Sequence, residues 1–262
     1  RHHTMEEYIR VKELITSNQT KEDVCVLNYE DEVLRKFGEQ VHTNVIYFSS
    51  LRKLDKGIYL EGDTIFYTDG QEMIEVTKTS ELKLLGLHNF ENVMVAVAMA
   101  YSVGVPMESI RRTIRRFAGV EHRIEYVTEK DGVAYYNDSK GTNPDAAIKG
   151  IQAMNRPTLL IGGGYDKQST YEEWINAFDG KVRYLVLIGQ TREKIAKAAK
   201  SCGFPAENII FCEDLKEAVT TCAAKAVSGD AVLLSPACAS WGQFDNYEQR
   251  GDMFKEYVRG LV

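Results

Sequence analysis

Three short, continuously apolar segments in the second half of the chain constrain the fold more than any other feature. They span residues 158–162 (TLLIG), 184–189 (YLVLIG) and 231–235 (AVLLS), and amphipathic stretches of helical length separate them. Apolar residues at every position, rather than at alternate positions, are typical of parallel strands buried on both faces. Such strands separated by single helices predict a parallel sheet with helices on both sides, a doubly wound, Rossmann-like α/β domain.

Periodicity and turn residues predict the remaining elements of this half. A hairpin is expected over residues 124–136, with its turn at Asp131-Gly132, and a further strand over 208–212. Helices are expected over residues 144–154, 171–178, 192–202, 215–228 and 243–258.

The first half of the chain has a mixed pattern. Between residues 57 and 76, short apolar runs alternate with Gly and Asp, which predicts hairpins with a turn at Asp69-Gly70. Further helices are expected over residues 4–17, 88–102 and 107–117, together with a short helix that ends at residue 37. Strands are expected over residues 23–28 and 45–49. A linker at 118–123 separates the two patterns, and we place the domains at residues 1–118 and 119–262.

Composition excludes several classes of protein. The net charge of −6 repels a nucleic-acid backbone, so we expect no nucleic-acid partner. No apolar run reaches the ~18 residues of a membrane span, and the first residues do not form a signal-peptide pattern. The five cysteines are odd in number, widely spaced and without a CxxC pair, which favours a reducing cytoplasm over a disulfide framework.

Any anionic ligand must therefore meet local Lys and Arg side chains. One candidate is the basic run on the predicted helix over 107–117, although a solvated helix face is the favoured interpretation of its spacing. The run comprises Arg111, Arg112, Arg115 and Arg116.

Three loops in the second half carry the candidate chemistry. The first, residues 137–143 (NDSKGTN), suits either a capped helix start or an anion site at a helix N-terminus. The second, residues 162–167 (GGGYDK), allows close backbone approach but lacks the GK[ST] ending of a Walker loop. The third, residues 234–251 (LSPACASWGQFDNYEQRG), joins a strand to a helix through small residues, and Cys238 has no sequence-evident histidine partner.

These loops, in this order, resemble the C-terminal domain of the Mur ligases. DSKGTN is similar to the family's DSK-x-TN signature, and SPACAS…YEQRG is similar to the segment of the members that add D-glutamate. Residues 88–92 (HNFEN) resemble the family's HN-x-x-N, and residues 121–123 (EHR) its x-HR at the domain junction. The resemblance extends over essentially the whole chain. It implies the C-terminal part of the α/β central ATPase domain in residues 1–118 and the whole amino-acid-binding domain in 119–262.

The resemblance also implies roles for individual residues. Lys12, Lys140 and His122 are implied in catalysis, with Lys12 as a carbamate near Mg²⁺. Asn89 and Asn92 are implied on the adenine side of ATP, and Arg123 and Asp138 at its phosphates and ribose. The residues implied around D-glutamate are Thr142, Asp166, Lys167, Ser240, Trp241 and Tyr247, together with Lys140. Trp241 stands where the family commonly has Leu, and Tyr247 where it usually has Phe.

The implied reaction joins D-glutamate to UDP-N-acetylmuramoyl-L-alanine in peptidoglycan precursor synthesis. ATP converts the acceptor carboxylate into an acyl phosphate, and Mg²⁺, Lys and Arg stabilise the charge that develops on oxygen. We expect a monomer that acts in the cytoplasm, with no membrane partner.

Three alternatives follow from what the sequence contains. The family's uridine-nucleotide domain, its GK[ST] loop and its glutamate and histidine ligands for Mg²⁺ are not found in it, and His2 and His3 are not assigned to that histidine. The chain is therefore either an excerpt of a working ligase or, by itself, an inactive module that binds D-glutamate or adenine nucleotide. A folate polyglutamate ligase is disfavoured by the SPACAS…YEQRG segment.

Overall fold

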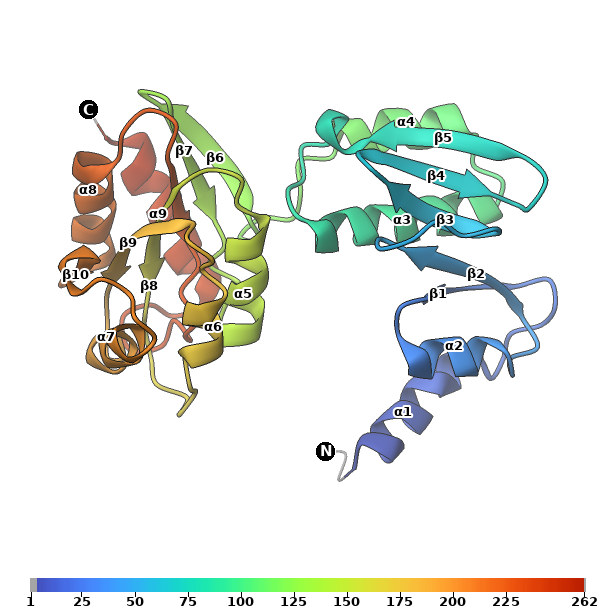
Figure 1. The fold of residues 1–262 in the computed structure, drawn as a ribbon, viewed down its shortest axis with the longest axis horizontal. Coiled ribbons are helices and arrows are strands. Elements are labelled where there is room, and N and C mark those ends of the chain that lie inside the picture. The colour runs from blue at the N-terminus through green and yellow to red at the C-terminus, as the bar shows by residue number, and fades with distance from the viewer. Residues whose placement is uncertain (1–3, 262) are drawn as a thin grey trace. The chain divides into compact units, whose positions relative to one another are not determined.

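The computed structural model describes residues 4–261, and its contacts divide the chain between Phe117 and Ala118 into two compact units (Figure 1). The sequence places the boundary one residue later, between residues 118 and 119. His2 and His3 lie outside the described residues. We describe each unit by itself.

The first unit contains a mixed five-stranded sheet in the order β1-β2-β3-β4-β5. β1, β2 and β3 are parallel, whereas β3, β4 and β5 form the antiparallel hairpins that the sequence predicts. The strands are β1 Val24–Asn28, β2 Asn44–Ser49, β3 Gly57–Glu61, β4 Thr64–Thr68 and β5 Met73–Lys78. The helices are α1 Met5–Glu13, α2 Glu32–Gly38, α3 Leu87–Ser102 and α4 Met107–Arg116, with 3₁₀ turns η1 Leu14–Thr16 and η2 Thr79–Glu81.

The core of this unit lies between the sheet and α3 with α4. Ile58 and Ile65 of the sheet pack with Met94 and Val97 of α3, and all four side chains are fully buried. On α4, Arg111 donates to the Val76 carbonyl at 3.2 Å and Arg115 to the Glu81 carboxylate at 2.9 Å. These two cations of the basic run therefore tie α4 to the sheet instead of forming an anion site.

The second unit is the doubly wound α/β domain that the sequence predicts. Its six-stranded sheet has the order β10-β9-β8-β11-β7-β6, and every neighbouring pair from β10 to β7 is parallel. The strands are β6 Glu125–Lys130, β7 Val133–Asn137, β8 Thr158–Gly162, β9 Val182–Leu187, β10 Ile209–Phe211 and β11 Ala231–Leu234. The helices are α5 Pro144–Ala153, α6 Glu172–Asn176, α7 Arg192–Ser201, α8 Leu215–Lys225 and α9 Tyr247–Arg259, with a 3₁₀ turn η3 Ala206–Asn208.

Helices cover both faces of this sheet (Figure 1). Leu159, Ile161 and Val232 of the central strands are fully buried together with Phe254 of α9, as continuous apolar strands require.

Several helix boundaries differ from the predicted ones, and two of them differ by four residues. The first helix ends as an α-helix at Glu13 and continues as a 3₁₀ turn to Thr16. The last helix begins at Tyr247 instead of 243, because the Asn246 side chain caps it by accepting from the Gln249 N–H.

Among residues 4–261 no helix is long and apolar enough to cross a membrane. All five cysteines lie in this described range and are free thiols.

Candidate functional site

The three loops of the second unit start side by side at one edge of its sheet. Asn137 at the end of β7 is in register with Leu234 of β11, which is in register with Ile161 of β8. Because these strands are parallel, the loops that follow them lie at the same edge, where doubly wound folds bind their ligands. The fold thus brings together segments about 100 residues apart in the chain.

The triple glycine loop packs tightly on the loop that follows β11. The Gly163 N–H donates to the Pro236 carbonyl at 2.8 Å, and the Tyr165 N–H donates to the Ala239 carbonyl at 2.9 Å. A Cβ at Gly164 would come within 2.4 Å of that Ala239 oxygen. The glycines therefore serve backbone packing between two loops.

Asn143 caps α5, with Pro144 at the first helical position. Its side chain accepts from the Ala146 N–H at 2.9 Å, so the end of the first loop is the capped helix start that the sequence allowed.

Asp138 is turned inward. Its side chain is only 4% exposed, accepts from the Ser235 hydroxyl at 2.7 Å and from the Ile124 N–H at 3.3 Å. Burial raises the pKa of Asp138 to about 7, against the opposing effects of these hydrogen bonds and of the Arg123 and Arg250 charges. The contact to ATP expected for Asp138 stays a prediction. In this structure the carboxyl group connects the segment before β6 to the loop after β11.

Two lysines of these loops, Lys140 and Lys167, each lie against an aromatic ring. The Lys140 ammonium lies 5.3 Å from the centroid of the Tyr247 ring, and the Lys167 ammonium lies 5.1 Å from that of Trp241. Lys140 and Tyr247 are half-buried, whereas Lys167 and Trp241 are exposed. The sequence indicated all four residues, and the structure pairs each lysine with one ring.

The other residues expected around D-glutamate differ in exposure. Thr142 is half-buried, and Ser240 is 4% exposed. Asp166 is paired with Lys194 of α7, whose ammonium lies 3.2 and 3.1 Å from the two carboxylate oxygens. Asp166 therefore contributes little net negative charge to the edge.

Arg250 is a residue that the sequence analysis did not select. Its side chain is fully buried, donates to the Ser139 hydroxyl and carbonyl, and donates to the Cys238 carbonyl at 3.2 Å. Burial lowers the pKa of Arg250 to about 10. The arginine stands in the motif segment YEQRG and could have been noticed there, but the sequence alone does not show which carbonyls it meets.

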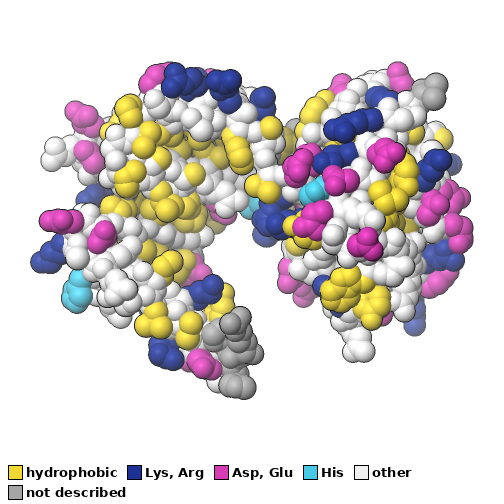
Figure 2. Space-filling model, turned by 180° about the vertical axis from the view of Figure 1, so that it is seen from behind, with side chains coloured by type: hydrophobic (Ala, Val, Ile, Leu, Met, Phe, Trp, Pro, Cys, Tyr) yellow, Lys and Arg dark blue, Asp and Glu magenta, His cyan; other side chains and the backbone are white. Residues whose placement is uncertain are grey.

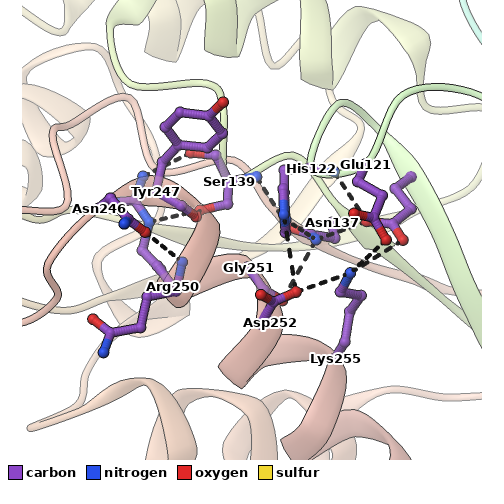
Figure 3. A network of polar contacts seen from close by, with 12 residues as sticks. Glu121, His122, Asn137, Ser139, Asn246, Tyr247, Arg250, Gly251, Asp252 and Lys255 are labelled. Atoms are coloured by element: carbon purple, nitrogen blue, oxygen red, sulfur yellow. Dashed lines mark hydrogen bonds and ion pairs between the residues drawn. The ribbon is translucent and has the colours of Figure 1, made fainter.

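His122, itself buried, belongs to a polar network that reaches the surface at Glu121 and Asp252 (Figure 3). Its Nδ1 lies 3.0 Å from the Asn137 amide nitrogen, so Nδ1 is the acceptor, and the Asn137 amide also donates to Glu125 at 3.0 Å. Lys255 of α9 completes the network with carboxylates of Glu121, Glu125 and Asp252 at 3.5, 3.5 and 3.1 Å. His122 is 5% exposed, and its implied catalytic role stays a prediction.

Lys255 keeps its charge in this buried setting. Burial alone lowers the pKa of Lys255, but the hydrogen bond with Asp252 and the charges of Glu125 and Glu121 outweigh it, so the net shift is upward. The network thus joins the segment before β6 to α9.

Asn89 and Asn92 of α3 lie in the first unit and have different environments. The Asn89 amide donates to the Leu85 carbonyl at 2.7 Å and its side chain is 6% exposed, whereas Asn92 is exposed. Arg123, in the second unit, is also exposed. Of the four residues expected at ATP, Asn92 and Arg123 are thus the two with exposed side chains.

Lys12 is exposed on α1, with its ammonium 5.5 Å from the Tyr8 ring centroid. It borders a hollow of about 430 Å³ between α1 and α2, which is lined mainly by apolar side chains such as Ile9, Leu34 and Phe37. Hydrophobic side chains are conspicuous on the surface of this first unit (Figure 2).

The described residues do not themselves fit a Mg²⁺ site. Within residues 4–261 no three His, Cys, Asp or Glu side chains gather to hold a metal ion. Mg²⁺ prefers six oxygen ligands in octahedral geometry, which one modified lysine cannot supply.

Two family models match the chain. Residues 1–100 match the Mur ligase middle domain, and residues 122–238 match the Mur ligase glutamate ligase domain. The chain therefore belongs to the Mur ligase family, as the sequence motifs indicated, and matches the models of its middle and C-terminal domains.

Curated proteins that are similar to this chain carry the same name. UDP-N-acetylmuramoylalanine–D-glutamate ligase of Lachnoclostridium phytofermentans is 57% identical over 261 residues, which cover 100% of this chain and 57% of that protein. The proteins of the same name from Lachnospira eligens and Clostridioides difficile are 55% and 46% identical, again over 100% of this chain and over 58% and 57% of their own lengths. The chain thus spans a little over half the length of the curated relatives it matches.

Solved structures show the same fold at low identity. UDP-N-acetylmuramate-alanine ligase MurC from Thermotoga maritima has a TM-score of 0.68 and 17% identity, covering 98% of this chain and 56% of that chain. MurF from Acinetobacter baumannii has a TM-score of 0.67 and 16% identity, covering 97% of this chain and 56% of that chain.

Proposed function

We propose that this protein joins D-glutamate to UDP-N-acetylmuramoyl-L-alanine and converts ATP to ADP, in peptidoglycan precursor synthesis. The observation that carries the proposal is the pair of lysines, Lys140 and Lys167, at the carboxyl edge of the second sheet, each set against an aromatic ring. Thr142 lies on the same loop as Lys140 and can add a hydroxyl donor. The relatives that share 46–57% identity carry the name of this activity.

The proposed substrate explains why this edge is cationic. D-glutamate brings two carboxylates, and ammonium groups are suitable donors to them. Asp166 does not oppose this, since Lys194 already pairs with its carboxylate at 3.1 Å. The aromatic rings of Tyr247 and Trp241 leave the lysine donors available while limiting the directions the side chains take.

The reaction needs a deprotonated amine and an activated acceptor carboxylate. ATP, when bound, supplies that activation. The residues of this chain then bind D-glutamate so that its amine lies near the activated acceptor carboxylate. Holding the two reacting groups in this geometry lowers the entropic cost of the reaction. We propose exposed Asn92 and Arg123 as the first residues to test for contact with the nucleotide.

The alternative, a module that binds D-glutamate or adenine nucleotide without ligation, is not favoured by any comparison. We propose a cytoplasmic, monomeric enzyme, and the five free thiols agree with a reducing compartment.

The test is ADP release by the intact protein in the presence of ATP, Mg²⁺, UDP-N-acetylmuramoyl-L-alanine and D-glutamate. We expect release to depend on both the uridine precursor and D-glutamate, and mass spectrometry to show the joined product. L-glutamate and L-alanine are the matched controls. Faster release with either control amino acid than with D-glutamate would reject the proposed substrate.

A further inference from the structure

The exposed ring of Trp241 has neighbours that fix its place. Its centroid lies 5.6 Å from that of Tyr165, with the ring planes at 60°, and the two side chains adjoin because Tyr165 and Ala239 form an antiparallel backbone bridge. Trp241 is 56% exposed and borders a hollow of about 630 Å³, together with Gln190 and Gln243. Its orientation therefore depends on Tyr165 and on the Lys167 ammonium more than on core packing.

Asp166, the residue directly before Lys167, is paired with Lys194 of α7. Both oxygens of Asp166 accept from Lys194, and one also accepts from the Gln168 N–H at 2.7 Å. Gln168 has a φ of +62°, and the chain bends there, directly after Lys167. Without Lys194, the Asp166 carboxylate would be the nearest available partner in sequence for the Lys167 ammonium.

We propose that Trp241 and Lys194 are positioning residues that keep the Lys167 ammonium oriented and un-neutralised for an anionic amino acid. A lysine side chain has many rotamers, and restricting them before binding lowers the entropic cost of binding. An aromatic face attracts an ammonium yet leaves N–H donors free for a carboxylate. This inference rests on the proposed function for its ligand, D-glutamate, but the contact itself is testable without one.

The ligand-free test uses the fluorescence of the 262-residue chain. Its two tryptophans differ, because Trp174 is fully buried and Trp241 is exposed. We expect Lys167→Met to increase acrylamide quenching of Trp241 in a Trp174→Phe background, and Lys200→Met, at an exposed position of α7, to leave it unchanged. Equal quenching in the Lys167 variant and its parent would show that the cation does not restrain the ring. This readout remains valid even if the protein ligates a different amino acid.

The kinetic test uses the intact protein. We expect Trp241→Leu to raise the KM for D-glutamate about fivefold with kcat unchanged, which corresponds to about 1 kcal/mol. Trp241→Phe should restore most of the affinity, because the ring is kept. Lys194→Met should raise KM similarly by freeing Asp166 to pair with Lys167, whereas Lys194→Arg should not.

A double-mutant cycle decides whether Trp241 acts through Lys167. If it does, Trp241→Leu has little further effect on KM once Lys167 is replaced by Ala, so the two changes are not additive. Additive effects on KM, or a fall in kcat with KM unchanged in Trp241→Leu, would overturn the proposal.

Discussion

Arg250 donates to two oxygens of the same residue, the hydroxyl of Ser139 at 2.9 Å and its carbonyl at 2.7 Å. Ser139 lies in the loop after β7, and the remaining bond, to the Cys238 carbonyl, reaches the loop after β11. A single guanidinium from α9 thus joins two of the three loops that carry the candidate D-glutamate contacts. Because the side chain is fully buried, the Ser139 and Cys238 carbonyls would lose this partner if the guanidinium were removed, whereas the Ser139 hydroxyl would keep its bond to the Tyr247 carbonyl.

We predict that Arg250→Met lowers the free energy of unfolding of the second unit by about 3–5 kcal/mol, since it removes several hydrogen bonds from a buried cation. Urea denaturation measures this change. Arg259→Met, at the exposed end of the same helix, is the control and should cost less than about 0.5 kcal/mol. A cost below about 1 kcal/mol for the Arg250 variant would contradict a clamping role.

The sequence predicted the sheet of the second unit because a continuously apolar segment indicates a strand that is buried on both faces. The order of its strands was not predicted, since β11 is inserted between β8 and β7 by contacts about 75 to 100 residues apart in the chain. The lysines of the candidate site were found through motifs. Arg250 was missed and Asp138 was expected to face a ligand, because a motif gives a residue's identity and not the direction of its side chain.

The triple glycine supplies the second prediction. Gly163 has a φ of +102°, and a Cβ there would lie 2.1 Å from the Ile188 carbonyl oxygen. We predict that Gly163→Ala lowers the free energy of unfolding by more than about 2 kcal/mol, as it combines backbone strain with a clash that must move a strand end.

Gly242→Ala separates the two causes. Gly242 also has a positive φ, +90°, but nothing lies within 4 Å of the position that a Cβ would take there. This variant should therefore cost only about 1 kcal/mol, the strain alone. Equal destabilisation of the two variants in urea would show that contact between the loops adds nothing.

The third prediction concerns Lys167 as a contact for D-glutamate. A charge-assisted hydrogen bond contributes about 1.5–3 kcal/mol, so Lys167→Ala should raise the KM for D-glutamate about tenfold or more in the intact protein. The KM for ATP should not change, and Lys200→Ala on α7 is the matched lysine control. An unaltered KM for D-glutamate would remove Lys167 from the site.

The fourth prediction concerns Lys12, which the family resemblance implies as a carbamate. The ammonium is exposed on α1, so CO₂ can reach it. We predict that Lys12→Ala is nearly inactive in the ligation assay and regains part of its activity with added acetate, because a free carboxylate can replace the missing oxygen ligand. Full activity of Lys12→Arg together with no rescue by acetate would identify Lys12 as an ordinary surface residue.

The last prediction is a pH dependence of stability that arises from Asp138. Folding raises the pKa of this carboxyl group from its ordinary 3.8 to about 7, chiefly through burial. The folded state therefore binds the proton more tightly than the unfolded state, so the stabilising contribution is complete below about pH 4 and is lost as the pH rises through 7. Asp138→Asn keeps the shape and is neutral at every pH, so subtracting its stability from that of the wild type cancels the other titrating groups.

We expect the free energy of unfolding of the wild type, relative to that of Asp138→Asn, to fall by at most about 4 kcal/mol between about pH 4 and about pH 7. The difference should level off at higher pH. Unfolding free energies from urea titrations at several pH values measure it. The Asn side chain can still accept from the Ile124 N–H and donate to the Ser235 hydroxyl, so the loop contacts persist in the variant. A difference that stays constant over this range would mean that Asp138 is ionised in the folded protein throughout, with its charge balanced by Arg123 and Arg250.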